Sequence, residues 1–134
     1  MYDLTSDAIP ALLDTQNRYF AVFDSSGDLI GFCCFGKEGR VPGGEYEEDQ
    51  PGTLDVGVGM SPEKMGQGLG SNFISAVLQY ALERYNPATF RVSIAEFNLR
   101  SQRAFLSQGF KEAARFKRTT DEMPIVQFEI RATR

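Results

Sequence analysis

A helical repeat of apolar side chains is the most regular pattern in the chain. From Ser71 onward an apolar residue falls at every fourth position, at Phe73, Val77, Ala81 and Tyr85. Polar side chains occupy the opposite side of the repeat. This spacing predicts an amphipathic helix, and the Asn-Pro pair at residues 86–87 ends it.

Shorter apolar runs on both sides of this helix have the pattern of β-strands. The runs at residues 18–24 and 29–36 flank the turn sequence SSGD and predict a hairpin. Further strands are predicted at residues 53–60, 89–97, 112–118 and 124–132, the last two joined as a second hairpin. A weakly helical segment at residues 3–16, broken by Pro10, precedes all of them.

A second helix is predicted from about Leu99 to Gln108. Asn98 is suited to cap its start and Gly109 to end it, because these residue types accept the backbone geometry and hydrogen bonds of helix ends. The order helix, hairpin, strand, helix, strand, helix, hairpin is typical of an α/β fold with helices on the faces of a mixed sheet. The length predicts a single domain over residues 1–134.

Charge and composition narrow the functional classes. The net charge of −4 argues against nucleic-acid binding, because phosphate contacts need a basic surface. No apolar run has the length of a membrane span and no secretory signal is visible, so we expect a cytoplasmic protein without a membrane partner. The chain has no histidine, which excludes Ser-His-Asp and Cys-His nucleophilic sites and His-based zinc sites. The adjacent Cys33 and Cys34 are interpreted as small core residues on opposite faces of a strand.

Closely spaced glycines precede the long helix, in the stretch EKMGQGLGSNF at residues 63–73. A dinucleotide fingerprint does not fit, because the third glycine is Gly70 and position 71 is a serine, and no Gly-Lys-Ser/Thr run forms a Walker loop. Glycines that expose backbone N–H groups at a helix start form an anion site, most naturally for phosphate. Gly57 and Gly59 in the preceding strand indicate close approach by a backbone or a ligand. Together these features favour a long ligand with an amide-bearing arm and a pyrophosphate, namely coenzyme A; a glycine-rich turn without a ligand is the alternative.

Two long segments resemble a known family. The stretch DVGVGMSPEKMGQGLGSNFISAVLQYALERY, followed by RVSIAEFNLRSQRAFLSQGFKE, resembles the GNAT superfamily of acetyl-CoA-dependent N-acetyltransferases, and most closely a bacterial branch of it. The family motif Gln/Arg-x-x-Gly-x-Gly/Ala is matched from Met65 to Gly70, and its later Asn and Gly-Phe marks by Asn98, Gly109 and Phe110. The resemblance covers residues 19–118. It implies a mixed, mostly antiparallel central sheet flanked by helices, whose usual first strand we expect this chain to lack.

The resemblance also implies which residues bind acetyl-CoA, the acetyl donor. The backbone of Val58, Gly59 and Met60 would pair with the pantetheine arm. The pyrophosphate would lie on the motif and its N–H groups, at Met65, Gly66, Gln67, Gly68, Leu69, Gly70 and Ser71. Asn98 would contact the arm, and Ser101 and Phe105 would line the thioester end. A plain N-cap and a core aromatic residue are the alternative interpretations of Asn98 and Phe105.

Two residues depart from the family pattern. Met65 stands where Gln or Arg is usual, which removes a polar contact to phosphate that Lys64 or Arg100 could replace. Phe105 stands where many relatives carry a Tyr that is proposed to protonate the departing thiolate. Phenylalanine has no proton to give, so water or another Tyr would serve.

Amide formation needs a neutral amine, and a carboxylate, often through water, can accept its proton. Asp55 and Glu96, on neighbouring predicted strands, are the candidate bases, with paired or solvated carboxylates as the alternative. The Met60 N–H is our candidate for polarising the thioester carbonyl. The acidic loop GGEYEEDQPG would suit a cationic amine, with Tyr46 and Glu47 as candidate substrate contacts and Tyr46 as a candidate acid; a solvated surface loop is the alternative.

The leading hypothesis is an N-acetyltransferase that moves acetyl from acetyl-CoA to a primary amine of a small molecule or peptide by direct attack in a ternary complex. An acyl-CoA sensor without catalysis is the first alternative, and a structural subunit whose glycine turn binds nothing is the second. We expect no metal and no nucleic-acid partner. A homodimer is compatible with the family.

Overall fold

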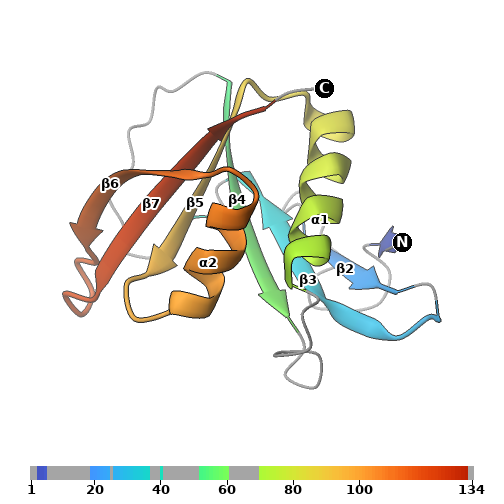
Figure 1. Cartoon of the computed structure of the whole chain (residues 1–134), viewed down its shortest axis with the longest axis horizontal. Helices are drawn as coiled ribbons and strands as arrows, with labels where there is room; N and C mark the ends of the chain where they lie inside the picture. Colours follow the sequence, from blue (N-terminus) through green and yellow to red (C-terminus); the bar gives the residue numbers. More distant parts are fainter. Residues whose placement is uncertain are drawn as a thin grey trace.

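The computed structural model describes residues 3–5, 19–24, 26–36, 40, 52–60 and 70–132. The elements are β1 (Asp3–Thr5), β2 (Tyr19–Phe23), β3 (Leu29–Phe35), β4 (Thr53–Met60), α1 (Gly70–Tyr85), β5 (Thr89–Ala95), α2 (Leu99–Ser107), β6 (Lys111–Lys117) and β7 (Pro124–Arg131) (Figure 1). Both predicted hairpins, both single strands and the last two predicted helices are confirmed. Most of the weakly helical segment at residues 3–16 lies outside the described residues.

The seven described strands form one sheet in the order β1-β2-β3-β4-β5-β7-β6. Every neighbouring pair is antiparallel except β4 and β5, which are parallel. The predicted mixed, mostly antiparallel sheet is therefore confirmed. The structure differs from expectation at the first strand, because Asp3–Thr5 pairs with β2 at the edge of the sheet. A strand of three residues is too short to show an alternating pattern in the sequence.

Both helices cover the same face of the sheet (Figure 1). The apolar side of α1 is buried as its period predicts, with Phe73 and Val77 packed in one cluster with Val56 of β4 and Val92 of β5. Burying a large apolar side chain of this kind contributes about 1.5–3 kcal/mol relative to leaving it exposed. None of the helices among the described residues is long and apolar enough to span a bilayer.

The helix ends follow the local chemistry of the sequence. Asn86 has the left-handed φ of 48°, which asparagine tolerates, and directly follows the last residue of α1. At the start of α2, the Asn98 side chain accepts a hydrogen bond from the Ser101 N–H at 3.2 Å. Gly109 has a φ of +98° after the end of α2, where a side chain would be strained. These ends fix where α2 sits beside the sheet.

The sheet opens between β4 and β5. Their parallel pairing runs only from Thr53–Thr89 to Val56–Val92. Beyond that point β4 stays paired with β3 as far as Met60, and β5 stays paired with β7 as far as Ala95. Figure 1 shows the two strands spreading apart toward their C-terminal ends. Along any strand, successive N–H and C=O groups point alternately to the two sides, so each strand presents unpaired backbone groups to the opening.

Candidate functional site

A cavity of about 170 Å³ lies in the opening between β4 and β5. Its walls are formed by Val56, Gly57 and Val58 of β4, residues 92–95 of β5, and Asn98, Ser101 and Phe105 at α2. Side chains of successive strand residues point to opposite faces of a sheet. Because consecutive residues of both strands line this cavity, it lies within the plane of the sheet.

A larger cavity of about 310 Å³ adjoins the opening on the helix side. It lies between the end of β4, the start of α1 and the start of α2, and it is lined by Val58, Gly59, Met60, Gly70, Phe73, Ile74, Asn98, Arg100, Ser101 and Ala104. Val58, Asn98 and Ser101 line both cavities. The two cavities therefore form one path from the helix starts into the gap of the sheet, which suits a long, narrow ligand.

The start of α1 faces the larger cavity. Gly70 is the first residue of this 16-residue helix, lines the cavity, and has no acidic residue in the turn that follows. The N–H groups of a helix's first turn lack partners within the helix and carry partial positive charge, so this end can receive an anion. Ser71 uses its hydroxyl elsewhere, accepting from Gln108 Nε2 at 2.8 Å. The predicted Met65, Gly66, Gln67, Gly68 and Leu69 lie outside the described residues.

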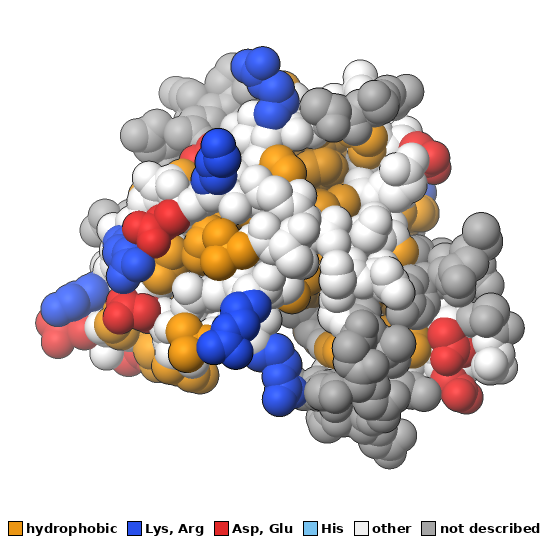
Figure 2. Space-filling model, viewed as in Figure 1, with side chains coloured by type: hydrophobic (Ala, Val, Ile, Leu, Met, Phe, Trp, Pro, Cys, Tyr) orange, Lys and Arg blue, Asp and Glu red, His pale blue; other side chains and the backbone are white. Residues whose placement is uncertain are grey.

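The start of α2 supplies the polar wall of the path. Asn98 caps the helix through Ser101, which confirms the N-cap interpretation, and it also lines both cavities. Arg100 lines the larger cavity and is a permanent positive charge there. Figure 2 shows basic side chains gathered over the start of α2. Site prediction from the sequence missed Phe73, Ile74 and Ala104, because their helical spacing indicates only a core face.

Phe105 belongs both to the hydrophobic core and to the wall of the smaller cavity. It is fully buried and packs edge-to-face against Phe110, with ring centroids 5.1 Å apart. It also lines the cavity in the opening. Phe105 is therefore a core residue, as one of the two interpretations has it. Its ring also forms part of the cavity wall where the thioester end is expected. No hydroxyl is present at this wall position to donate a proton.

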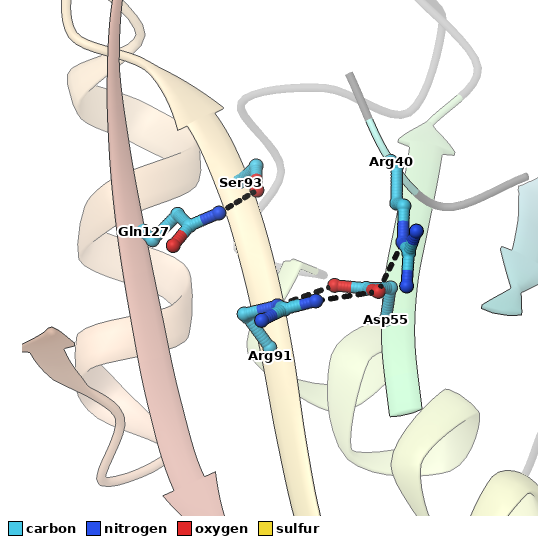
Figure 3. Close-up of polar contacts among 5 residues, drawn as sticks. All are labelled: Arg40, Asp55, Arg91, Ser93 and Gln127. Atoms are coloured by element: carbon cyan, nitrogen blue, oxygen red, sulfur yellow. Dashed lines mark hydrogen bonds and ion pairs between the residues drawn. The ribbon is translucent and has the colours of Figure 1, made fainter. Parts of the chain in front are cut away.

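Asp55 is held in a buried ion cluster on the face of the sheet opposite the helices (Figure 3). Its Oδ1 accepts from Arg91 Nε at 2.7 Å, and its Oδ2 accepts from Arg91 Nη2 at 2.9 Å and from Arg40 Nε at 2.8 Å. Asp55 is 3% exposed and Arg91 4%. Both carboxylate oxygens are engaged, and Asp55 lines neither cavity. This geometry disfavours Asp55 as the proton acceptor and favours the alternative of a paired carboxylate.

Glu96 follows the last residue of β5 and is half exposed. Its Oε2 lies 3.6 Å from Arg115 Nη1, and Arg115 also binds Glu112 through two hydrogen bonds. Those hydrogen bonds lower the pKa of Glu112, with the charge of Arg115 adding to the effect. Glu96 lines neither cavity, so a base role would require solvent between it and the reacting amine.

The remaining predicted residues divide between the site and the core. Met60 lines the larger cavity at the end of β4. Tyr46 and Glu47 lie outside the described residues. Cys33 and Cys34 form no disulfide and are buried on opposite faces of β3, as predicted. No three His, Cys, Asp or Glu side chains in the described ranges are grouped to hold a metal ion.

Known proteins share this fold. The family described as Acetyltransferase (GNAT) domain matches residues 4–111. The spermidine N-acetyltransferase from Vibrio cholerae, solved with CoA and spermine, has a TM-score of 0.69 at 19% identity, over 89% of this chain and 68% of that one. A GNAT-family acetyltransferase from Bacillus anthracis has a TM-score of 0.68 at 17% identity, over 88% of this chain and 70% of that one. No curated protein matches the chain. The family match spans most of the sequence and includes both walls of the opening, so this chain belongs to the GNAT family of N-acetyltransferases.

Proposed function

We propose that this protein transfers the acetyl group of acetyl-CoA to a primary amine by direct attack in a ternary complex. The observation that carries the proposal is the continuous path from the start of α1 into the gap between β4 and β5. One end of this path offers helix N–H groups to phosphate. The other end offers unpaired strand backbone to amide groups and opens to the far face of the sheet.

The donor would lie along this path with its groups matched to the walls. The pantetheine arm would pair with the backbone of Val58, Gly59 and Met60, close to Asn98 and Ser101. The pyrophosphate would lie on the N–H groups from Gly66 to Ser71. Arg100 would supply the charge that Met65 does not, because it is the cation among the residues that line the larger cavity.

The chemistry requires one bond to form and one to break. The amine nitrogen attacks the thioester carbon, the C–N bond forms, and the C–S bond breaks to release coenzyme A thiolate. We assign polarisation of the carbonyl oxygen to the Met60 N–H. The amine proton passes through water to a carboxylate, for which Glu96 is a better candidate than the doubly paired Asp55. The thiolate takes its proton from water or from Tyr46, because Phe105 has none.

A solved relative and the acidic loop of the sequence both support a small amine as the acceptor. The solved relative from Vibrio cholerae is described as binding spermine, which supports a small amine acceptor for this chain. The acidic loop that contains Tyr46 and Glu47 would attract such a cation before it loses a proton. A single domain, a cytoplasmic location and a homodimer stay predictions. An acyl-CoA sensor is the second candidate, because Phe105 removes a proton donor that many relatives use.

Two measurements test the proposal in sequence. Acetyl-CoA and free coenzyme A should each raise the thermal stability, since a ligand at 100 times its Kd adds about 2.7 kcal/mol. Release of free thiol in the presence of a panel of polyamines, amino acids and peptides then separates an enzyme from a sensor. Absence of any thermal shift with both ligands would refute the donor site, and binding without thiol release would favour the sensor.

A charge placed in the glycine turn tests where the pyrophosphate binds. Gly68→Glu adds a negative charge and bulk to that turn, so binding of acetyl-CoA should fall at least about tenfold while the protein stays folded. Ser75→Glu adds the same charge to the exposed side of α1, away from the larger cavity, and should bind normally. Unchanged binding by Gly68→Glu would contradict the placement.

A further inference from the structure

An aromatic ring lies against β4 on the face of the sheet opposite α1 and α2. Phe32 of β3 is the register partner of Gly59 of β4. Val56 of β4 belongs to the core on the helix side of the sheet. Because successive residues of a strand point to opposite faces, Gly57 and Gly59 lie on the other face. Phe32 shares that face with Gly59, and its side chain is 37% exposed.

The glycine in β4 is explained by this ring. A Cβ atom at Gly59 would lie 2.6 Å from Cζ of Phe32 and closer still to Cε1, distances that real Cβ atoms do not show. Only glycine therefore lets the ring lie across β4 at this position. The neighbouring Gly31 has the same constraint, because its Cβ would lie 2.8 Å from the Cα of Met60. Two glycines thus hold β3, β4 and the ring of Phe32 in close contact.

The ring of Phe32 lies against the part of β4 that is no longer paired with β5. The β4–β5 pairing ends at Val56, so Gly59 lies three residues into the open part of β4. The helix side of the opening is the path assigned above to the donor, with its polar wall at Asn98 and Ser101. An amine must then approach from the opposite face, on which the ring of Phe32 lies against Gly59 of β4.

We propose that Phe32 is a specificity-determining residue, which contacts the chain of the acceptor and favours an alkyl diamine over an amine that carries a carboxylate. This inference rests on the proposed function. The π-face of a phenyl ring carries negative charge density, so it attracts an ammonium group and repels a carboxylate. Its carbon atoms also pack against methylene groups. A second ammonium group a few carbons from the attacking nitrogen can therefore rest on the ring, and a carboxylate at that position cannot.

Three acceptors of equal chain length separate these effects: 1,4-diaminobutane, butylamine and 4-aminobutyrate. The wild-type kcat/KM should fall in that order. Phe32→Leu keeps an apolar side chain but loses the ring, so kcat/KM for 1,4-diaminobutane should fall about three- to tenfold, the range of a modest cation–π contact. Butylamine should change less, and the KM for acetyl-CoA should not change. Phe32→Tyr should retain the wild-type order of acceptors.

A matched control lies on the same strand. Leu29 of β3 is 42% exposed, and Leu29→Ala should leave the order of the three acceptors unchanged. If Phe32→Leu acetylates 1,4-diaminobutane with the wild-type preference over 4-aminobutyrate, the role of Phe32 is overturned while the transferase proposal stands. If the wild-type protein acetylates other amines of the wider panel but none of these three, the acceptor inference fails while the proposed reaction stands. If it binds acetyl-CoA but acetylates no amine of the wider panel, the proposed reaction fails.

Discussion

The buried ion cluster allows a structural carboxylate to be distinguished from a catalytic one. Asp55→Asn removes the charge that faces two guanidinium groups, and its new NH₂ group points a donor at the donors of Arg91. Arg91 is 4% exposed, so water cannot replace the lost partner. Breaking a buried pair from one side costs about 3–5 kcal/mol, a large part of the 5–15 kcal/mol that stabilises a typical domain.

Urea unfolding measures this loss directly. With a slope of about 1–3 kcal/mol per molar for a small protein, the midpoint of Asp55→Asn should fall by about 1 M or more. Glu96→Gln is the control, because the Glu96–Arg115 pair is exposed and its loss should change stability by less than about 1 kcal/mol. In an Arg91→Met background, Asp55→Asn should cost less than it does alone, since the unpaired buried cation is then absent.

The opposite result would refute this reasoning. If Asp55→Asn unfolds at the wild-type urea concentration but loses more than about a hundredfold in kcat with saturating amine, Asp55 accepts the proton and the pair with Arg91 is incidental. If Glu96→Gln instead causes such a loss in kcat without a change in stability, the base is Glu96.

Two further predictions concern the core. Burial raises the pKa of the Cys33 thiol, and the neighbouring Cys34 raises it further. Iodoacetamide at pH 8 should therefore label neither buried cysteine in the native protein and both in urea, as counted by mass spectrometry. Rapid labelling of the native protein would contradict their placement. Phe105→Ala should lower the free energy of unfolding by about 3–5 kcal/mol, because the ring is fully buried against Phe110. The control Leu106→Ala, on the exposed side of α2, should lower it much less. Equal losses in a denaturant titration would show that Phe105 is not a core residue.

Features encoded in neighbouring residues could be predicted from the sequence. The four-residue repeat of α1 and the Asn98 and Gly109 ends of α2 are local signals, and the observed bounds follow them within about one residue. The family motif likewise indicated the path at Val58 to Met60 and Asn98, because its parts are short and fixed in spacing.

Features that depend on residues distant in the sequence could not be predicted in this way. Asp55 and Arg91 are 36 residues apart, so the pair that engages both oxygens of Asp55 has no local sign. Asp55 therefore looked as suitable for a base as Glu96. Gly59 was expected to mark the approach of a backbone or a ligand, but the group that lies against it is the ring of Phe32 from another strand. Sequence patterns report which face a residue occupies better than they report what lies against it.

The short pairing of β4 and β5 has a mechanical consequence. The sheet consists of one half built from residues 3–60 and another from residues 89–131, and the described pairing joins them through four residue pairs only. The Asp55–Arg91 ion pair connects the two halves of the sheet, one residue pair before the β4–β5 pairing ends. A small change in the angle between the two halves at this pairing is therefore amplified into a larger change in width further along the opening, where Gly59 and Ala95 line the cavities. Substitutions of Asp55 or Arg91 should therefore alter the width of the opening, even though these two residues line neither cavity.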